Sequence, residues 1–482
     1  MNTIFLRIKR STLILVFLVF VGTTLNAQSI EKDKRLGKEA YENVVSTMGL
    51  YEDSAMTAYV NKLGQKLVSH LDSALFDYHF YIINEESPNA FAVPGGYVFI
   101  TTGILPLIET EDEFACIIGH EIIHANNRHT IRQVRKRIIP VLVELPVDIV
   151  AAIVPGADII AAPVRTTNQL LFASYSRKFE TEADDYGIAL AAKSGYDPTA
   201  LPRVLNRMNK AIELITGESE SKSYFADHPY TPDRNANIEK QVKKLRVIKS
   251  APVSSNFLME FNGVIYGESA ANGVVRKNVF MHPDIDFYIK YPDDWAVQNM
   301  DTAVAASSPD KDAALVLTMA DSKLTAEQAG KKYLSKLSKN YKSILSSAEP
   351  FKVNDNEGYL VSFEEVVYGD TTHAYVLWLT IGDNLFRLTA VSNNHQRKTL
   401  LTIAESLRKL TPEERASIMD RYMKVVQAQS GETMKTLSER TGNTLRLDLL
   451  DVINDRNKER VLKEGDLIKI VIEKPYISKV DD

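Results

Sequence analysis

Two histidines lie four residues apart in the run His120-Glu121-Ile122-Ile123-His124. This spacing puts both imidazoles on one face of a helix, one turn apart, where they can bind a single ion. Neutral imidazole is a good ligand for Zn2+, and two of them leave room for a third protein ligand and a water. Glu121 points roughly 100° away around the helix, from where it can reach a metal-bound water rather than the metal. The alternative, two histidines that face solvent or a core, is disfavoured because the surrounding helix is apolar and well capped.

A third ligand should come from another helix, and the acidic cluster between Ser176 and Asp184 offers one. Glu180 and Asp184 are four residues apart and therefore share a helical face. We predict that Glu180 binds the metal while Asp184 accepts a hydrogen bond from a ligating imidazole and fixes its orientation. Without the histidines, such a cluster would most often be a solvated helix face.

Several elements are expected to position these residues. The histidine helix should start at Thr110, a plausible N-cap with Glu113 as its capping-box partner. A second helix is predicted over 177–193, and further helix up to residue 247. Upstream, we predict helix over about 30–75 and a strand over 76–83. Two short strands should then surround the Pro-Gly-Gly turn within residues 90–100.

The chain changes character beyond the helical part. Segments 287–291, 314–317 and 374–379 are rich in β-branched and aromatic residues and favour strands. They predict a separate α+β domain over 257–410. A final unit over 424–475 follows a polar, helical linker.

Composition sets limits on class and chemistry. The 482 residues are 45% hydrophobic and 25% charged, with a net charge of −5, which predicts folded domains and disfavours a nucleic-acid partner. The chain is long enough for two or three hydrophobic cores. Cys116 is the single cysteine, so disulfides within the chain are excluded, and its apolar neighbours predict a small buried side chain.

The N-terminus resembles a secretory signal peptide. Basic residues Arg7, Lys9 and Arg10 precede an apolar run over 13–21, and Ala27 ends a plausible cleavage site. We therefore predict an exported chain, with a retained N-terminal anchor as the alternative. A second apolar stretch, 138–164, is interrupted by prolines and acids, which favours broken helices over a core or cleft and leaves membrane-surface contact open.

Several motifs of this chain occur together, and in this order, in one known family. They are Asn89-Ala90-Phe91-Ala92-Val93-Pro94-Gly95-Gly96, His120 to His124 with Arg128-His129, Ser176-Arg177 through Asp184, and His228-Pro229 with Asp233-Arg234. On these residues the segment from about 84 to 235 resembles the gluzincin metallopeptidases that include the HtpX heat-shock protease and the CAAX prenyl protease. The likeness is greatest to the exported bacterial branch of that family.

The resemblance implies a role for each matched position. His120, His124 and Glu180 correspond to the zinc ligands and Glu121 to the general base, while Asp184 would orient a ligand. His228 corresponds to a histidine near the metal that stabilises the oxyanion or occludes the site. Arg177 and Arg234 resemble residues that anchor helices or pair with acids. The stretch Phe91, Ala92 and Val93 would be the edge strand onto which an extended substrate adds through main-chain hydrogen bonds.

The last unit resembles a divergent LysM module, around Gly431-Glu432-Thr433 and the run from Leu462 to Ile470. By resemblance it would bind peptidoglycan glycan, and the alternative is a small domain that packs on its neighbour. We thus predict an α+β protein in four parts. These are a signal peptide (1–27), a mainly helical metallopeptidase domain with a small sheet (28–250), an α+β domain of unknown role (257–410) and a LysM-like module (424–475).

The leading functional prediction is an exported zinc endopeptidase of the periplasm, associated with membrane or cell wall. It would carry one Zn2+ per chain and act on unfolded, misfolded or stalled envelope proteins, with peptidoglycan and outer-membrane assembly factors as further partners. Two alternatives stay open. One is a cell-wall binding protein or chaperone with a structural metal site, which has no need of Glu121, and the other is a peptidoglycan-directed metal hydrolase.

Overall fold

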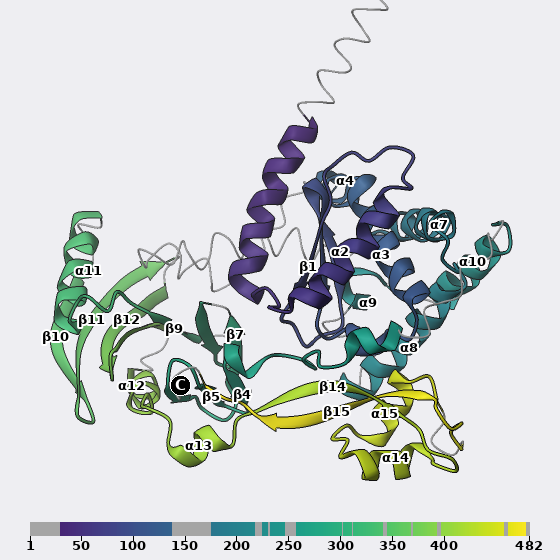
Figure 1. The fold of residues 1–482 in the computed structure, drawn as a ribbon. Helices are drawn as coiled ribbons and strands as arrows, with labels where there is room; N and C mark the ends of the chain where they lie inside the picture. Colours follow the sequence, from purple (N-terminus) through teal and green to yellow (C-terminus); the bar gives the residue numbers. More distant parts are fainter. Residues whose placement is uncertain are drawn as a thin grey trace, which may run out of the picture.

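The computed structural model describes most of the chain as two lobes joined by a long β-ribbon (Figure 1). The predicted signal peptide and the apolar stretch 138–164 lie outside the described residues. No helix among the described residues is long and apolar enough to cross a membrane. The described residues are 29–136, 175–216, 224–229, 232–245, 257–300, 302–310, 312–340, 345–367, 370–392, 397–456 and 461–478.

A small three-stranded sheet forms part of the first lobe. Strand β1 (His79–Ile83) pairs in parallel with β3 (Tyr97–Thr101), and β3 pairs antiparallel with β2 (Ala90–Val93). The order β1-β3-β2 leaves β2 at an edge. Strands were predicted in these places, and the Pro-Gly-Gly turn lies between β2 and β3 as expected, with Gly95 and Gly96 at positive φ. The predicted helix over 30–75 is two helices, residues 29–48 and α2 (Ser54–Val68).

The helix that carries the two histidines, α3 (Glu111–Asn126), is the centre of this lobe, and nearly its whole length is buried. Thr110 is its N-cap, as predicted, and its side chain accepts from the Glu113 N–H. The other half of the predicted capping box, in which the Glu113 carboxylate would accept from the Thr110 N–H, is wrong. The Glu113 carboxylate accepts instead from the Glu109 N–H and from Arg207, a buried residue on the neighbouring helix. A carboxylate buried in the core is stable only when it has a charged partner such as this arginine.

Other helices surround α3 in the first lobe. They are α4 (His129–Lys136), α7 (Arg177–Lys193), α8 (Ala200–Thr216), α9 (Tyr224–Asp227) and α10 (Pro232–Val242). Of these, α7 matches its predicted range and lies directly against α3. The first lobe is therefore mainly helical with a small sheet, as the sequence predicts.

The second lobe is built on an antiparallel seven-stranded sheet of order β10-β11-β12-β13-β9-β8-β7. Helix α11 (Ala326–Asn340) packs on one face, where Tyr333 contacts Trp378, and α12 (Arg397–Glu405) and a three-stranded sheet, β4-β5-β6, pack on the other. The strands are β4 (Val274–Arg276), β5 (Val279–His282), β6 (Phe287–Lys290), β7 (Ala296–Met300), β8 (Ala303–Ser307), β9 (Ala313–Met319), β10 (Leu345–Val353), β11 (Asn356–Val367), β12 (Asp370–Ile381) and β13 (Asn384–Ser392).

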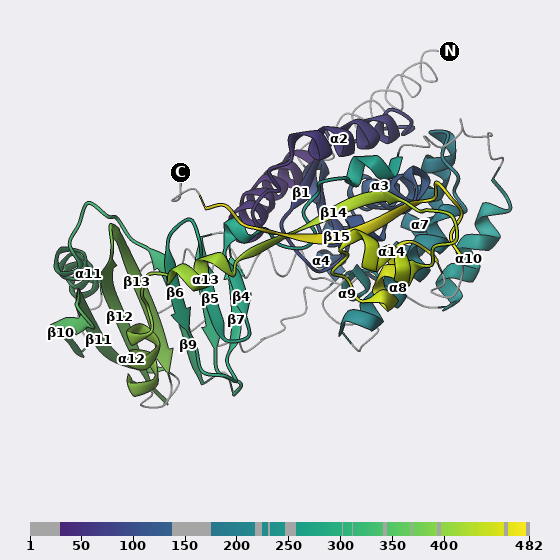
Figure 2. The same ribbon diagram turned by 60° about the horizontal axis from the view of Figure 1, so that its bottom comes forward.

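The C-terminal unit returns to the first lobe. Strands β14 (Met419–Gln427) and β15 (Leu467–Pro475) form an antiparallel ribbon that runs along both lobes (Figures 1 and 2). Helices α14 (Met434–Thr441) and α15 (Leu447–Ile453) lie at its far end, and α15 packs against α8. One hydrophobic core includes Leu201 of α8 together with Leu450 of α15 and Ile470 of β15.

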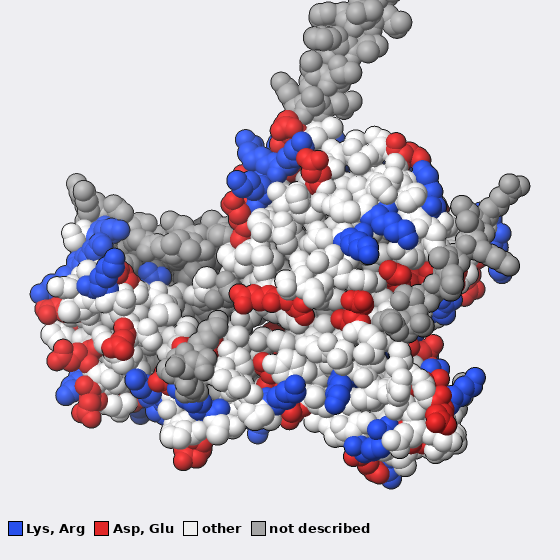
Figure 3. Space-filling view, viewed as in Figure 1, with Lys and Arg blue, Asp and Glu red and all other residues white. Residues whose placement is uncertain are grey.

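Charged side chains of both signs are distributed over both lobes on the face drawn in Figure 3. Some belong to short-range pairs along helices, such as Arg35 with Glu39 and Lys38 with Glu42. These pairs are solvent-exposed, and each is expected to contribute at most about 1 kcal/mol. Ion pairs that are buried have greater structural consequence.

Candidate metal centre

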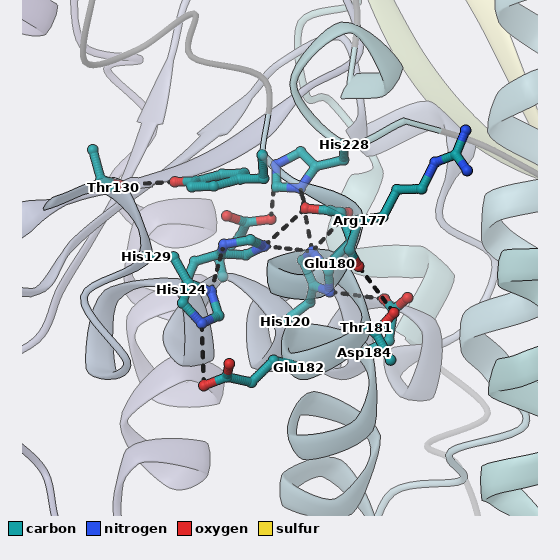
Figure 4. Close-up of polar contacts among 12 residues, drawn as sticks. His120, His124, His129, Thr130, Arg177, Glu180, Thr181, Glu182, Asp184 and His228 are labelled. Carbon is teal, nitrogen blue, oxygen red and sulfur yellow. Dashed lines mark hydrogen bonds and ion pairs between the residues drawn. The ribbon is translucent and has the colours of Figure 1, made fainter. Parts of the chain in front are cut away.

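Four buried side chains point their ligand atoms at one point in the first lobe (Figure 4). His120 and His124 come from α3, Glu180 from the first turn of α7, and His228 directly follows α9. The His120 and His124 Nε2 atoms are 2.9 Å apart. His228 Nδ1 lies 3.2 Å from His120 Nε2 and 3.1 Å from Glu180 Oε1. The three predicted ligands are thus brought together.

The donor set fits a zinc ion. Ligands at 2.0–2.1 Å from a tetrahedral Zn2+ are about 3.3 Å from each other. Glu180 Oε1 lies 3.3 Å from His124 Nε2, and its Oε2 lies 3.7 Å from His120 Nε2. Since both imidazoles present Nε2 to the same point, a cation between them satisfies both lone pairs at once. Two imidazoles and a carboxylate are a common zinc set.

Charge in this pocket favours a cation. Burial lowers the pKa of His120 and of His124, which keeps both imidazoles neutral and able to coordinate. Burial opposes ionisation of Glu180, but His228 and Arg234 outweigh it and hold its pKa well below the ordinary value. Burial also opposes a charged His228, yet the carboxylates of Glu180 and Glu121 raise its pKa to about 9. Those carboxylates stabilise positive charge at the point where the ligand atoms converge.

Glu121 lies beside the cluster without joining it. Its carboxylate is completely buried, and Oε1 is 3.6 Å from His228 Nε2. The two acids therefore differ in position. Glu180 lies among the ligand atoms, whereas Glu121 lies outside them, next to His228. That is the geometry expected for a base rather than a ligand.

The predicted orienting residues differ in what they contact. Asp184 Oδ1 lies 3.0 Å from His120 Nδ1, on the side of the ring away from the cluster, and its carboxylate accepts two hydrogen bonds of 2.8 Å from Arg234. Arg234 also pairs with Glu180 Oε2 at 3.0 Å. Arg177, by contrast, is exposed, and its side chain points away from the cluster (Figure 4).

Two glycines allow α3 and α7 to approach closely enough for this cluster to form. A Cβ on Gly187 would meet the backbone N and Cα of His120 at 3.0 Å, and one on Gly119 would meet the Gly187 carbonyl at 3.1 Å. The helices therefore touch backbone to backbone beside the first ligand. Glu180, two turns before Gly187 on α7, is thereby placed opposite His124.

The predicted substrate strand is at the edge of its sheet, since β2 pairs only with β3 among the described strands. Phe91, Ala92 and Val93 are all buried, and β2 packs against α3. The loop just before β2 is held by a hydrogen bond from the Tyr224 N–H to the Pro88 carbonyl. Because Tyr224 begins α9 and stacks on His228, with centroids 4.4 Å apart, the strand and the His228 segment are mechanically connected.

Sequence reasoning missed the contacts that surround His124. His129 Nδ1 lies 3.1 Å from His124 Nδ1, and His129 Nε2 lies 3.4 Å from Glu182 Oε1. The Tyr175 ring stacks on His124 with centroids 4.0 Å apart, and its hydroxyl bonds Thr130 at 2.8 Å. His129 belonged to a motif already singled out, and Glu182 to the acidic cluster, but spacing along the chain gave no sign that they meet.

The part of the chain that carries this geometry is similar to known proteins. A model of peptidase family M48 matches residues 54–242. The beta-barrel assembly-enhancing protease of Escherichia coli is 29% identical over 231 residues, which is 47% of this chain and 46% of that protein. The mitochondrial metalloendopeptidase OMA1 of Schizosaccharomyces pombe is 29% identical over 234 residues, 46% of this chain and 64% of that protein.

The chain spans about half to two thirds of the length of these curated relatives. OMA1 of Saccharomyces cerevisiae is 31% identical over 189 residues, covering 37% of this chain and 52% of that protein. A crystal structure from Bacteroides thetaiotaomicron covers 38% of this chain and 70% of its own at 12% identity, with a TM-score of 0.24 that supports no structural argument. The family match contains every ligand atom described above, so the metal centre lies within the part of this chain, residues 54–242, that is similar to peptidase family M48.

Proposed function

We propose that this chain is a zinc-dependent endopeptidase in which His120, His124 and Glu180 hold the ion and Glu121 is the base. The observation that carries the proposal is the separation of roles among buried groups. The imidazoles of His120 and His124 converge with the Glu180 carboxylate. The Glu121 carboxylate, on the same helix as the two histidines, lies 3.6 Å from His228 and outside the ligand set. A purely structural site has no use for that second acid.

The residues of this chain then have defined tasks. Bound zinc would acidify a water and polarise the substrate carbonyl. The Glu121 carboxylate takes the proton from the attacking water and later delivers it to the leaving amine. His228 donates from Nε2, the ring nitrogen that faces Glu121 rather than the ligand atoms, to the carbonyl oxygen as negative charge develops there. Asp184 holds His120 by Nδ1, and Arg234 holds Asp184.

The decisive test uses Glu121→Gln. Wild type and variant are loaded with zinc, metal content is quantified, and cleavage of unfolded casein is measured. We expect one zinc per chain in both and a loss of 10²–10⁴-fold in rate for the variant, the range ordinarily contributed by a general base. Glu111→Gln, the same exchange in the first turn of the same helix and outside the ligand set, is the control and should cut at the wild-type rate.

A second candidate is a structural or latent metal site, and one observation favours it. The His228 ligand atom lies within 4.8 Å of the other three, so it can complete a four-ligand site. His228→Ala separates the cases. A fall in casein cleavage supports its oxyanion role, a rise supports occlusion by His228, and zinc-loaded protein that is inactive in both forms supports a structural site.

We also propose unfolded chains of the cell envelope as substrates, after export through the predicted signal peptide. Support comes from the edge position of β2 (Phe91, Ala92 and Val93) and from the printed names of the bacterial relatives, which concern β-barrel assembly. Addition to an edge strand reads main chain rather than side chains. Equal cleavage rates for the folded and unfolded forms of one substrate would contradict the proposal.

For the C-terminal unit the LysM-like interpretation stays a proposal, with peptidoglycan glycan as the ligand. Its helix α15 packs on α8, so a glycan would have to use another surface, such as that around α14. Co-sedimentation of the zinc-loaded Glu121→Gln protein with peptidoglycan sacculi tests this. Digestion of muropeptides rather than casein by the wild type would favour a peptidoglycan hydrolase.

A further inference from the structure

A line of polar contacts leads from His124 away from the metal cluster. His124 Nδ1 lies 3.1 Å from His129 Nδ1, and His129 Nε2 lies 3.4 Å from Glu182 Oε1 (Figure 4). His129 is completely buried, and its ring stacks on Phe179 at 4.6 Å and 17°. The line ends near the surface, where the Glu182 side chain is 23% exposed.

The positions of the nitrogens fix the protons along this line. Since His124 Nε2 faces the cluster, a neutral His124 ring carries its proton on Nδ1 and donates it toward His129 Nδ1. His129 must then accept at Nδ1 and carry its own proton on Nε2, the atom that faces Glu182. The carboxylate at the end of the line therefore selects the tautomer of both rings.

Both ends of the line are anchored. Glu182 Oε1 also accepts from Asn127 Nδ2 at 2.8 Å and from Arg132 Nη1 at 3.2 Å, which holds the carboxylate in place. His129 returns toward His124 because the chain reverses at Arg128, which has a φ of 55° and pairs with the buried Asp33 of the helix over 29–48. A non-glycine residue at positive φ is uncommon and needs such support.

We propose that His129 is a positioning residue for the metal ligand His124, and that Glu182 positions His129. The arrangement gives His124 what Asp184 gives His120: a fixed ring and a fixed tautomer, with Nε2 free for the ion. Partners of this kind typically change metal affinity 10- to 100-fold. The inference deepens the proposed function and rests on its metal site, though not on its protease activity.

Two substitutions at position 129 separate hydrogen bonding from packing. His129→Phe keeps an aromatic ring to stack on Phe179 and removes both nitrogens. His129→Gln removes the ring but keeps an acceptor for His124 and a donor for Glu182. Zinc dissociation constants are measured by competition with a chromophoric chelator, and the visible absorption of cobalt-substituted protein reports ligand geometry.

We expect His129→Phe to weaken zinc binding 10- to 100-fold and to shift the cobalt spectrum, and His129→Gln to stay within about threefold of wild type. Zinc binding by His129→Phe within threefold of wild type, with an unchanged spectrum, would overturn the proposal. So would equal losses in both variants, because the residue would then act through its shape.

A variant at the far end of the line guards against misfolding. Glu182→Leu leaves the buried ring of His129 in place and removes its carboxylate partner, and we expect a three- to tenfold loss of zinc affinity with unchanged circular dichroism. Unchanged affinity would contradict the role of Glu182. Because zinc affinity is the readout, a wild-type chain that binds zinc but fails to cut casein disproves the proposed activity and leaves this inference standing.

Discussion

Arg234 is the residue on which the charge balance of the site depends. Its guanidinium donates two hydrogen bonds to Asp184, one to the His228 carbonyl, and pairs with Glu180. With Glu121, three buried carboxylates surround one arginine and the His228 imidazole. A pocket with this excess of negative charge is stabilised by a divalent cation.

Arg234→Met should therefore destabilise the metal-free protein more than the zinc-loaded one. Removing one partner of a buried pair costs about 3–5 kcal/mol, and zinc compensates in part by pairing with Glu180. Urea denaturation with and without zinc measures both. Arg177→Met, an exposed arginine that points away from the cluster, should change the free energy of unfolding by less than about 0.5 kcal/mol. Equal effects for the two variants would contradict this account.

For single residues, the sequence identifies the side chains whose ligand atoms converge better than the side chains that support them. His120 and His124 follow from helical periodicity alone, because four residues make one turn. Glu180 required a second helix, and its choice over neighbouring acids came from pairing with Asp184 and from family resemblance. His129 could not be placed, since its contact with His124 depends on the backbone reversal at Arg128, which no residue preference announces.

Helices α3 and α7 must cross at a fixed distance for the cluster to exist. That distance is set by Gly119 and Gly187, where each helix meets the backbone of the other. Interiors packed in this way tolerate an added methyl group only by moving one element. The third ligand comes from α7, so any such movement carries Glu180 away from the two histidines.

Gly187→Ala should weaken zinc binding at least tenfold although alanine favours helix by about 1 kcal/mol. The new Cβ would lie 3.0 Å from the backbone of His120 and push the helices apart. Zinc affinity and thermal unfolding are the measurements. Gly195→Ala is the control: a Cβ there meets nothing within 4 Å, but φ is 89°, so about 1 kcal/mol of stability should be lost without loss of zinc affinity. Unchanged zinc binding in Gly187→Ala would show that the crossing is adjustable.

Element types were predictable where local patterns decide them. Helix α7 and the N-cap Thr110 are confirmed because they follow from periodicity and capping chemistry. The Glu113 half of the capping box is wrong because Arg207, 94 residues away, competes for the same carboxylate. Long-range ion pairs of this kind override a local motif, and no local pattern reveals them.

In the whole molecule, the C-terminal unit and the first lobe share one hydrophobic core. Lys469 of β15 is completely buried there, and its Nζ donates to the carbonyls of Pro106 and Ile108 at 2.8 and 2.6 Å. Glu109 Oε1 lies 2.8 Å away. These three partners immediately precede Thr110, the N-cap of the helix that carries the histidines. A sequence read segment by segment could suggest a separate module but could not show where its lysine lies.

Lys469→Met should destabilise the whole first lobe by about 3 kcal/mol, because two buried carbonyls and one carboxylate lose their donor. In chemical denaturation followed by near-ultraviolet circular dichroism, the transition of the first lobe should shift as a whole. Lys424→Met, on the paired strand opposite Ile470 and exposed, serves as the control with little expected change. A first-lobe transition that keeps its wild-type midpoint in Lys469→Met would contradict this account of the shared core.

The same lysine gives the stability of the molecule a pH dependence with a definite sign. Burial lowers the pKa of Lys469, although the Glu109 carboxylate opposes that effect. Between this lowered pKa and the unfolded value of about 10.4, the unfolded chain binds the proton that the folded chain has released. Stability therefore rises with pH through this window and is lost as pH falls through the folded pKa. The difference in unfolding free energy between wild type and Lys469→Met, measured from pH 7 upward, should grow in favour of the wild type. Taking this difference cancels every titration common to both proteins. A flat or falling difference would mean that Glu109 and the two carbonyls stabilise the ammonium group at least as well as water does, so that its pKa is not lowered.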